Sequence, residues 1–219
     1  MSILKASGIK KAYSTLEVLK GINLDINGGE IISIVGASGA GKSTLLHVLG
    51  LLDSPDAGQV LVNGTDVRKL GTNEKAKFRN KEIGFVFQFH NLLPEFTALE
   101  NVCIPAYIGG KEKAESEQRA MELLNELGLK NREHHKPAQL SGGEQQRVAV
   151  ARALVNNPSI VFADEPSGNL DSKNAKALHD IFFSLRDRTN QTFVIVTHND
   201  ELADMADRKL VIQDGVILT

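Results

Sequence analysis

The chain of 219 residues carries 25 Lys and Arg against 27 Asp and Glu, a net charge of −2, and 42% of its residues are hydrophobic. That length fits one domain, with or without an inserted subdomain, and the charge balance argues against nucleic-acid binding through bulk positive charge. The single cysteine excludes an internal disulfide. The start of the chain does not resemble a signal peptide, and no stretch has the ~18 unbroken apolar residues of a membrane span. We therefore expect a soluble protein, which could act at a membrane only through a partner.

The first third of the chain predicts strands. GINLDIN at 21–27 alternates apolar and polar residues as a half-buried strand does, whereas EIISIV at 30–35 is the continuous apolar run of a strand buried on both faces. Asn63-Gly64 predicts a hairpin, and IGFVFQ at 83–88 predicts a further strand. Phe85, Phe87 and Phe89 alternate there, so we expect them to pack on the core or on a sheet face.

The later segments predict helices alternating with buried strands. Residues 111–128 place leucines on one face at helical spacing and end in Gly128, a residue suited to a helix C-terminus. We expect a mostly helical insert over about 89–138. Beyond it, SIVFADEP and FVIVTH predict buried strands on either side of a helix, and Asp214-Gly215 predicts a closing hairpin. This order indicates an α/β fold with a mainly parallel sheet, an antiparallel β subdomain and an inserted helical subdomain.

A phosphate-binding loop is the first candidate site. GASGAGKS fits G-x-x-x-x-G-K-[ST] between a predicted strand and a predicted helix, which defines a P-loop NTPase core. Glycines let backbone N–H groups surround phosphates at a helix N-terminus, Lys42 would reach the terminal phosphates, and the Ser43 hydroxyl would ligate Mg²⁺. The loop residues predicted to bind the phosphates of a nucleotide are Gly36, Ala37, Ser38, Gly39, Ala40, Gly41, Lys42, Ser43 and Thr44.

An acidic pair follows a later strand. Asp164 and Glu165 stand at the C-terminal end of the buried run IVFADEP, the edge at which α/β sheets bind ligands. Asp164 suits the Mg²⁺ shell, and Glu165 suits a general base that activates water.

A second glycine stretch, LSGGEQQR, raises the question of a second anion site. Ser141, Gly142 and Gly143 precede a predicted helix and supply another set of backbone donors. Either the chain binds two separate nucleotides, or two chains share each nucleotide. Because no second Lys-Ser pair exists to hold Mg²⁺-nucleotide, we favour a two-fold dimer in which each phosphate loop faces the partner's serine–glycine motif.

The combination of GASGAGKST, LSGGEQQR, IVFADEP and THND resembles the nucleotide-binding subunit of ABC transporters across essentially the whole chain. The resemblance implies one ATPase domain over 1–219, with core and β subdomain at 1–88 and 139–219 and the helical insert at 89–138. It implies that two copies close head to tail around two ATPs. It further implies that Tyr13 stacks on adenine, that Gln88 senses Mg²⁺ and the attacking water, that Asp171 contacts the dimer partner, and that His198 touches the γ-phosphate. Taken alone, Tyr13 is more simply an ordinary half-buried tyrosine, and a lone histidine at position 198 is more often structural, although the phosphate site at the same sheet edge favours a functional role for His198.

Two stretches, FVFQFHNLLPEFTALENV at 85–102 and EPSGNLD at 165–171, resemble those of the ABC subgroup that serves lipoprotein-releasing and macrolide-exporting systems. The first stretch is most similar to that of the lipoprotein-releasing members. Apolar residues in a loop beside a switch often mark a partner contact, so Leu92, Leu93, Pro94 and Phe96 favour a membrane permease bound at residues 88–101. The expected place is the cytoplasmic face of a bacterial inner membrane, as a peripheral subunit with no nucleic-acid partner. A macrolide exporter and a cell-division complex stay open as alternatives, and a DNA- or ribosome-acting ATPase is less favoured.

Overall fold

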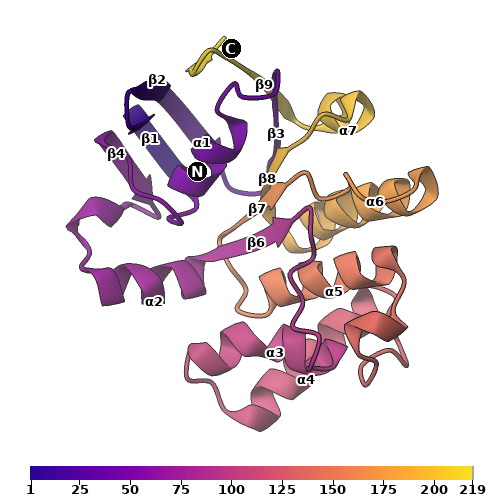
Figure 1. Cartoon of the computed structure of the whole chain (residues 1–219). Helices are drawn as coiled ribbons and strands as arrows, with labels where there is room; N and C mark the ends of the chain where they lie inside the picture. The colour runs from indigo at the N-terminus through magenta and orange to yellow at the C-terminus, as the bar shows by residue number, and fades with distance from the viewer. Residues whose placement is uncertain (219) are drawn as a thin grey trace.

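The computed structural model describes residues 1–218, whose larger sheet has six strands in the order β10-β9-β3-β8-β7-β6 (Figure 1). Five of them run parallel, and β10 pairs antiparallel with β9, which confirms the mainly parallel sheet and the closing hairpin. The strands are β3 (Ile31–Val35), β6 (Ile83–Phe87), β7 (Ile160–Asp164), β8 (Thr192–Val196), β9 (Arg208–Gln213) and β10 (Val216–Ile217).

The smaller sheet is wholly antiparallel, in the order β2-β1-β4-β5. Its strands are β1 (Ser2–Tyr13), β2 (Leu16–Asn27), β4 (Ala57–Val62) and β5 (Thr65–Asp66). The predicted hairpin at Asn63-Gly64 joins β4 to β5. Strand β1 was not predicted, because register irregularities, including one between Ala6 and Ile9, interrupt the alternation that marks a strand.

Seven α-helices lie within residues 1–218. They are α1 (Lys42–Leu49), α2 (Thr72–Glu82), α3 (Ala98–Ile108), α4 (Lys113–Glu126), α5 (Gly142–Leu154), α6 (Ser172–Thr189) and α7 (Asp200–Met205), with 3₁₀ turns η1 (Val67–Lys69) and η2 (Pro137–Gln139). Helix α4 confirms the predicted leucine-bearing helix, and Gly128 follows it with φ +72°, a conformation that favours glycine. Helix α2 buries no residue, so periodicity could not reveal it.

Two hydrophobic cores cover the two faces of the large sheet. Successive residues of a strand point to opposite faces, and β8 shows this directly. Phe193 and Ile195 join the core that includes α5 and α6, whereas Val194 and Val196 join the core that includes α1. Figure 1 accordingly shows α1 on one side of the sheet and α5 and α6 on the other.

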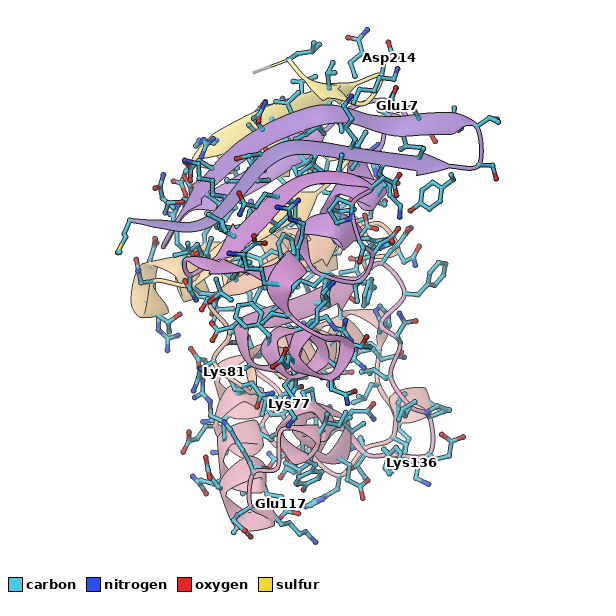
Figure 2. All side chains as sticks on the ribbon, turned by 90° about the vertical axis from the view of Figure 1, so that its left-hand side faces the viewer. Glu17, Lys77, Lys81, Glu117, Lys136 and Asp214 are labelled. Carbon is cyan, nitrogen blue, oxygen red and sulfur yellow. The ribbon has the colours of Figure 1, made fainter. Side chains whose placement is uncertain are left out.

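The segment at 89–138 contributes α3 and α4, which pack with α5 in the first of these cores and lie at the end of the molecule away from the small sheet (Figure 1). In the view turned by 90°, Glu117 of α4 lies at that end, and Lys77 and Lys81 of α2 lie nearer the middle (Figure 2). Within residues 1–218, no helix combines the length and apolar character needed to cross a membrane.

The alternating phenylalanines behave differently from one another. Phe85 and Phe87 stack with ring centroids 5.6 Å apart, but Phe89 is 69% exposed. The packing prediction is therefore wrong for Phe89. Strand β6 ends at Phe87, so the alternation no longer applies once the chain leaves the sheet.

Candidate functional site

The phosphate loop joins the end of β3 to the start of α1, as its sequence context predicted. Gly36, Gly39 and Gly41 all have positive φ, so the loop needs glycine at these turns. A side chain at Gly36 would meet the Ile212 backbone oxygen at 2.2 Å, because β9 passes directly against the loop. Gly41 is the residue before α1, which brings the unpaired N–H groups of the helix start to the loop.

Lys42 and Ser43 are the first two residues of α1. The Lys42 Nζ donates to the carbonyl oxygens of Gly36 at 2.9 Å and Ala37 at 3.0 Å, so the ammonium group lies across the loop that it closes. The Ser43 Oγ donates to Asp164 Oδ1 at 3.2 Å, which joins the loop to the end of β7.

The oxygens of Ser43 and Asp164 fit a Mg²⁺ site. Burial raises the pKa of the Asp164 carboxyl, and the Ser43 hydrogen bond opposes that rise only in part. The Asp164 carboxylate is partly buried and makes no ion pair within residues 1–218, and a hard divalent cation with oxygen ligands would neutralise its charge.

Glu165 and His198 meet at the same edge of the sheet. Glu165 has φ +47°, a left-handed conformation that costs a non-glycine residue on the order of 1–3 kcal/mol and that is often found at functional sites. Its backbone N–H donates to the Val196 oxygen at 2.9 Å, which holds the turn. The Glu165 Oε2 accepts from the His198 backbone N–H at 3.2 Å and lies 2.7 Å from His198 Nδ1. The carboxylate is thus aimed along the edge, and the imidazole is 71% exposed beside it.

Gln88 follows β6, the strand next to β7. Its side-chain Nε2 donates to Asn169 Oδ1 at 3.1 Å, and Asn169 Nδ2 donates back to the Gln88 carbonyl at 3.2 Å. Asn169 lies between Glu165 and Asp171, so Gln88 is connected to the segment that follows the acidic pair.

Tyr13, at the end of β1, is half exposed and lies beside the phosphate loop. Its hydroxyl donates to Asp53 Oδ2 at 2.8 Å, and Lys11 Nζ lies over its ring at 5.2 Å from the centroid. The Asp53 hydrogen bond raises the pKa of Tyr13, whereas the nearby Thr44 hydroxyl lowers it. The ring is therefore fixed at one end with 49% of the residue open to a ligand.

The second glycine motif begins α5 with a capping box. The Ser141 Oγ accepts from the Glu144 backbone N–H at 3.3 Å, and the Ser141 N–H donates to Glu144 Oε2 at 2.8 Å. Hydrogen bonds from Arg132 first, and then from Ser141, lower the pKa of Glu144 to about 2.

The start of α6 lies against this motif. Asp171 caps α6 by accepting from the Asn174 N–H at 2.9 Å, and a side chain at Gly143 would meet Asn174 Oδ1 at 2.5 Å. Asp171 and the serine–glycine motif therefore form one surface.

The predicted residues thus fall into two groups. One gathers the phosphate loop, Asp164, Glu165 and His198 at the ends of β3, β7 and β8, with Tyr13 beside the loop and Gln88 linked through Asn169. The other gathers Ser141, Gly142, Gly143 and Asp171. Among residues 1–218, no hydrogen bond or ion pair connects the serine–glycine motif to the phosphate loop, as expected if each motif serves a different chain's nucleotide. Sequence reasoning missed Asp53, which lies outside every motif, and Asn169, which lies within EPSGNLD but received no role there.

Comparison with known proteins decides the family. The ABC transporter family matches residues 19–168, and the Lipoprotein-releasing system ATP-binding protein LolD of Cytophaga hutchinsonii is 62% identical over 99% of each chain. The chain belongs to the ABC transporter family. A LolD protein of Bacteroides thetaiotaomicron is 60% identical over 98% of this chain and 99% of its own length. A dimeric ATP-binding cassette, MJ0796, in a post-hydrolysis state bound to ADP and Pi, superposes with a TM-score of 0.90 at 40% identity and covers 99% of this chain and 97% of its own.

Membership confirms the resemblance drawn from the motifs and the P-loop NTPase fold. The chain is an ABC-type ATPase, a nucleotide-binding subunit that hydrolyses ATP.

Proposed function

We propose that this ATPase powers the release of lipoproteins from a bacterial inner membrane. The observation that carries the proposal is the near-complete match to LolD proteins, 62%, 60% and 58% identical over 98–99% of the chain. A match of that extent covers the phosphate loop, the signature and the loop after Gln88 together, so it concerns the whole subunit.

We infer that two copies close head to tail around two ATP molecules. The separation of the two motif groups within one chain supports this arrangement, as does the dimeric state of the similar cassette MJ0796. In each shared site, one chain supplies the loop 36–44, Lys42 and Tyr13, and the partner copy supplies Ser141, Gly142 and Gly143. Asp171, beside the serine–glycine motif, contacts the opposing copy.

The chemistry of hydrolysis follows from the residues at the sheet edge. Glu165 accepts a proton from the attacking water, and its aim is fixed by the strained backbone and by the His198 N–H. His198 presents its exposed ring to the terminal phosphate, and Lys42 neutralises the phosphate charge. Ser43, Gln88 and Asp164 would hold Mg²⁺, which supplies charge neutralisation on the phosphates when bound.

A membrane permease is the partner that we expect at residues 88–101. The loop at 92–97 has no regular structure, yet the buried Asn101 amide holds it by donating to the Leu93, Phe96 and Thr97 oxygens at 2.9–3.1 Å. Leu93 and Phe96 remain 43% and 40% exposed on this preformed turn. Large apolar side chains on a rigid turn fit a binding surface.

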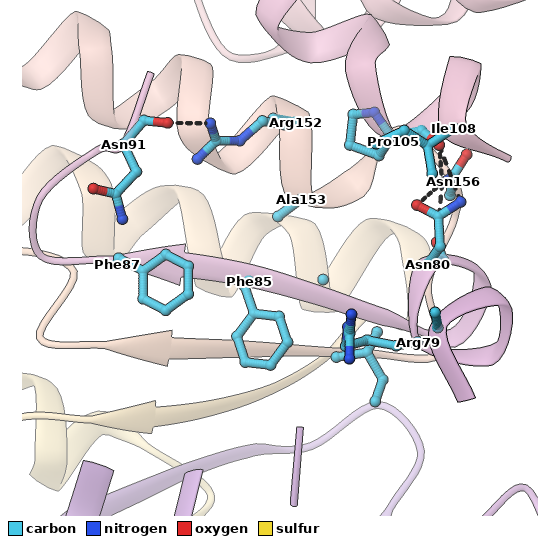
Figure 3. A pocket seen from close by; sticks show the side chains of 13 residues that line it. Arg79, Asn80, Phe85, Phe87, Asn91, Pro105, Ile108, Arg152, Ala153 and Asn156 are labelled. Carbon is cyan, nitrogen blue, oxygen red and sulfur yellow. Dashed lines mark hydrogen bonds between the residues drawn. The ribbon is translucent and has the colours of Figure 1, made fainter. Parts of the chain in front are cut away.

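A groove lies close to that loop. It has a volume of about 440 Å³ and runs between β6 and the helices α2, α3 and α5 (Figure 3). Phe85 and Phe87 form its floor, and Pro105 and Ile108 form an opposite wall. An apolar floor next to an exposed apolar turn supports insertion of a partner segment, which would hold the subunit at the cytoplasmic face of the membrane as a peripheral component.

Co-purification tests the function. The chain is tagged in its own cells, membranes are solubilised gently, and the proteins that accompany it are identified. A permease with few spans and a large extracytoplasmic domain, carrying bound lipoprotein, would support the proposal. A permease carrying a drug-like cargo or division proteins would replace lipoprotein release with the macrolide or cell-division alternatives, and recovery with ribosomes or DNA would overturn the transport role.

Charge substitution tests the partner surface. Phe96→Glu should abolish transport while ATP hydrolysis by the isolated subunit stays within about twofold, because exposed substitutions usually change stability by less than 0.5 kcal/mol. Leu92→Asp should act in the same way. Because Leu92 also packs against the core that includes α3, α4 and α5, this substitution should lower the stability of the fold more than Phe96→Glu does. Val216→Glu on β10, 37% exposed, is the matched control. A loss of isolated hydrolysis equal to the loss of transport would make the loop structural instead.

A further inference from the structure

A buried glutamine of α5 holds the loop that follows β6. Gln146 is fully buried, and its side-chain Nε2 donates to the Phe87 backbone oxygen at 3.1 Å. Its Oε1 accepts a hydrogen bond from His90 Nδ1. One side chain thus binds the loop at Phe87, directly before Gln88, and at His90, two residues after it.

Arg152, further along the same helix, binds the next part of the loop. Its guanidinium donates to the His90 oxygen at 2.8 Å and to the Asn91 oxygen at 2.7 Å, the second of which is drawn in Figure 3. Burial lowers the pKa of Arg152, and its charge is satisfied here by two carbonyl groups of the loop, with no carboxylate bonded to it among residues 1–218. Charge-assisted hydrogen bonds of this length are among the stronger ones in proteins.

Three of these four contacts are to backbone oxygens of the loop and one is to the His90 side chain, so none of them occupies the Gln88 side chain, which is free to change partner. In this structure the Gln88 amide is bonded to Asn169, a residue outside α5. Helix α5 therefore fixes the position of the loop, while the Gln88 amide can replace its hydrogen bond to Asn169 with one to a nucleotide-bound water. A displacement of α5 along or across its axis has to move the loop, because breaking these bonds leaves buried polar groups unpaired.

We propose that Gln146, with His90 and Arg152, is a positioning clamp that couples the two ATP sites of the dimer through each chain. Gln88 faces the chain's own ATP, whereas the start of the same α5, at Ser141, faces the ATP of the other copy. Engagement of Ser141 by one nucleotide shifts α5, and the clamp passes that shift to the loop that positions Gln88 at the other nucleotide. The inference rests on the shared-site dimer proposed above and is independent of the cargo and of the membrane partner.

The test compares two neighbouring glutamines of α5 in the purified full chain. Gln146→Met keeps the buried volume and removes both bonds to the loop. Gln145→Met is the matched control, because the Gln145 Nε2 donates to the Pro137 and Leu140 oxygens, both at 3.1 Å, and does not contact the loop of Gln88. ATP hydrolysis is measured against ATP concentration for both variants and the wild type, and thermal melting is recorded for all three.

We expect cooperative hydrolysis by the wild type and by Gln145→Met, with Hill coefficients approaching the two-site ceiling of about 2. For Gln146→Met we expect a Hill coefficient of about 1 and a rate at saturating ATP lower by roughly tenfold to a hundredfold, the range for a misplaced catalytic group. A merely structural role would lower the melting temperature without removing cooperativity.

Two results would overturn the clamp. If the wild type is cooperative and Gln146→Met is equally so, the clamp fails and the dimer stands. If the wild type itself shows a Hill coefficient of about 1, the two sites are not coupled and the clamp fails, whereas the shared-site dimer is decided separately by mixing Ser141→Ala and Lys42→Ala chains. Should Gln146→Met not fold, His90→Leu removes one bond of the same connection from the half-buried loop side, and its Hill coefficient decides in the same way.

Discussion

Replacement of Glu165 by glutamine separates ATP binding from ATP hydrolysis. The Glu165 Oε2 accepts from the His198 N–H at 3.2 Å and faces His198 Nδ1 at 2.7 Å. A glutamine oxygen can still accept from the backbone N–H, so the strained turn and the loop geometry are retained. What is lost is the carboxylate proposed to accept a proton from the attacking water. Loss of a general base lowers the rate by about 10²–10⁴-fold, which corresponds to about 3–5 kcal/mol of transition-state stabilisation.

Phosphate release at saturating ATP and Mg²⁺ measures the rate for the wild type and Glu165→Gln, with Lys42→Ala as the blank for contaminating ATPases. Size-exclusion chromatography in ATP measures the dimer, which should persist in Glu165→Gln because its ATP is consumed slowly. Hydrolysis within threefold of the wild-type rate would remove Glu165 from the role of general base. A slow variant that remains monomeric in ATP would instead indicate that Glu165 acts in nucleotide binding.

Three other predictions concern the dimer, the cap of α5 and the phosphate loop. Ser141→Ala and Lys42→Ala chains are each expected to be inactive alone. Random pairing makes half of the dimers in their mixture mixed, each with one of its two sites intact, so the mixture should recover up to about a quarter of wild-type activity. A mixture as inactive as its components would contradict shared sites. Glu144, whose pKa falls from 4.5 to about 2 on folding, should stabilise the fold above about pH 4.5 and lose that effect as pH falls towards 2. Denaturant titrations should therefore show Glu144→Gln less stable than wild type by about 1–3 kcal/mol at pH 6 and by less at pH 3, and a pH-independent difference would exclude an electrostatic origin. Gly36→Ala should lower the free energy of unfolding by a few kcal/mol, because its Cβ would lie 2.2 Å from a backbone oxygen. Gly39→Ala, whose Cβ would meet nothing within 4 Å, should lower it by about 1–2 kcal/mol through backbone strain alone. Equal melting temperatures for the two variants would refute the clash at Gly36.

Local sequence patterns predicted the strands and helices whose side chains are sorted by burial. The run EIISIV became β3 because parallel strands covered on both faces need continuous apolar residues. Helix α2 and strand β1 escaped prediction for the opposite reason. Helix α2 has no apolar face, and β1 contains irregularities that shift its alternation, so both depend on tertiary contacts that a periodicity does not record.

The site was predictable wherever backbone chemistry fixes the residue type, as at the positive-φ glycines of the phosphate loop and at the cap Ser141. It was not predictable where contacts join distant segments. Asn169 binds Gln88, 81 residues away in the sequence, and Gln146 binds Phe87, 59 residues away. No sequence spacing predicts contacts between residues so far apart. Gln146 lies inside the recognised LSGGEQQR stretch, yet only the fold shows that its amide faces the loop.

The alternation of β8 between two cores has a consequence for how the enzyme can change. Val194 and Val196 pack in the core that includes α1, the helix of the phosphate loop, and Phe193 and Ile195 pack in the core that includes α5, whose start carries the serine–glycine motif proposed to face a second copy. The odd-numbered and the even-numbered residues of this one strand therefore pack in different hydrophobic cores. Divergence during evolution can retune how firmly nucleotide is held, or how readily two copies join, by altering one register of the strand while the other stays untouched.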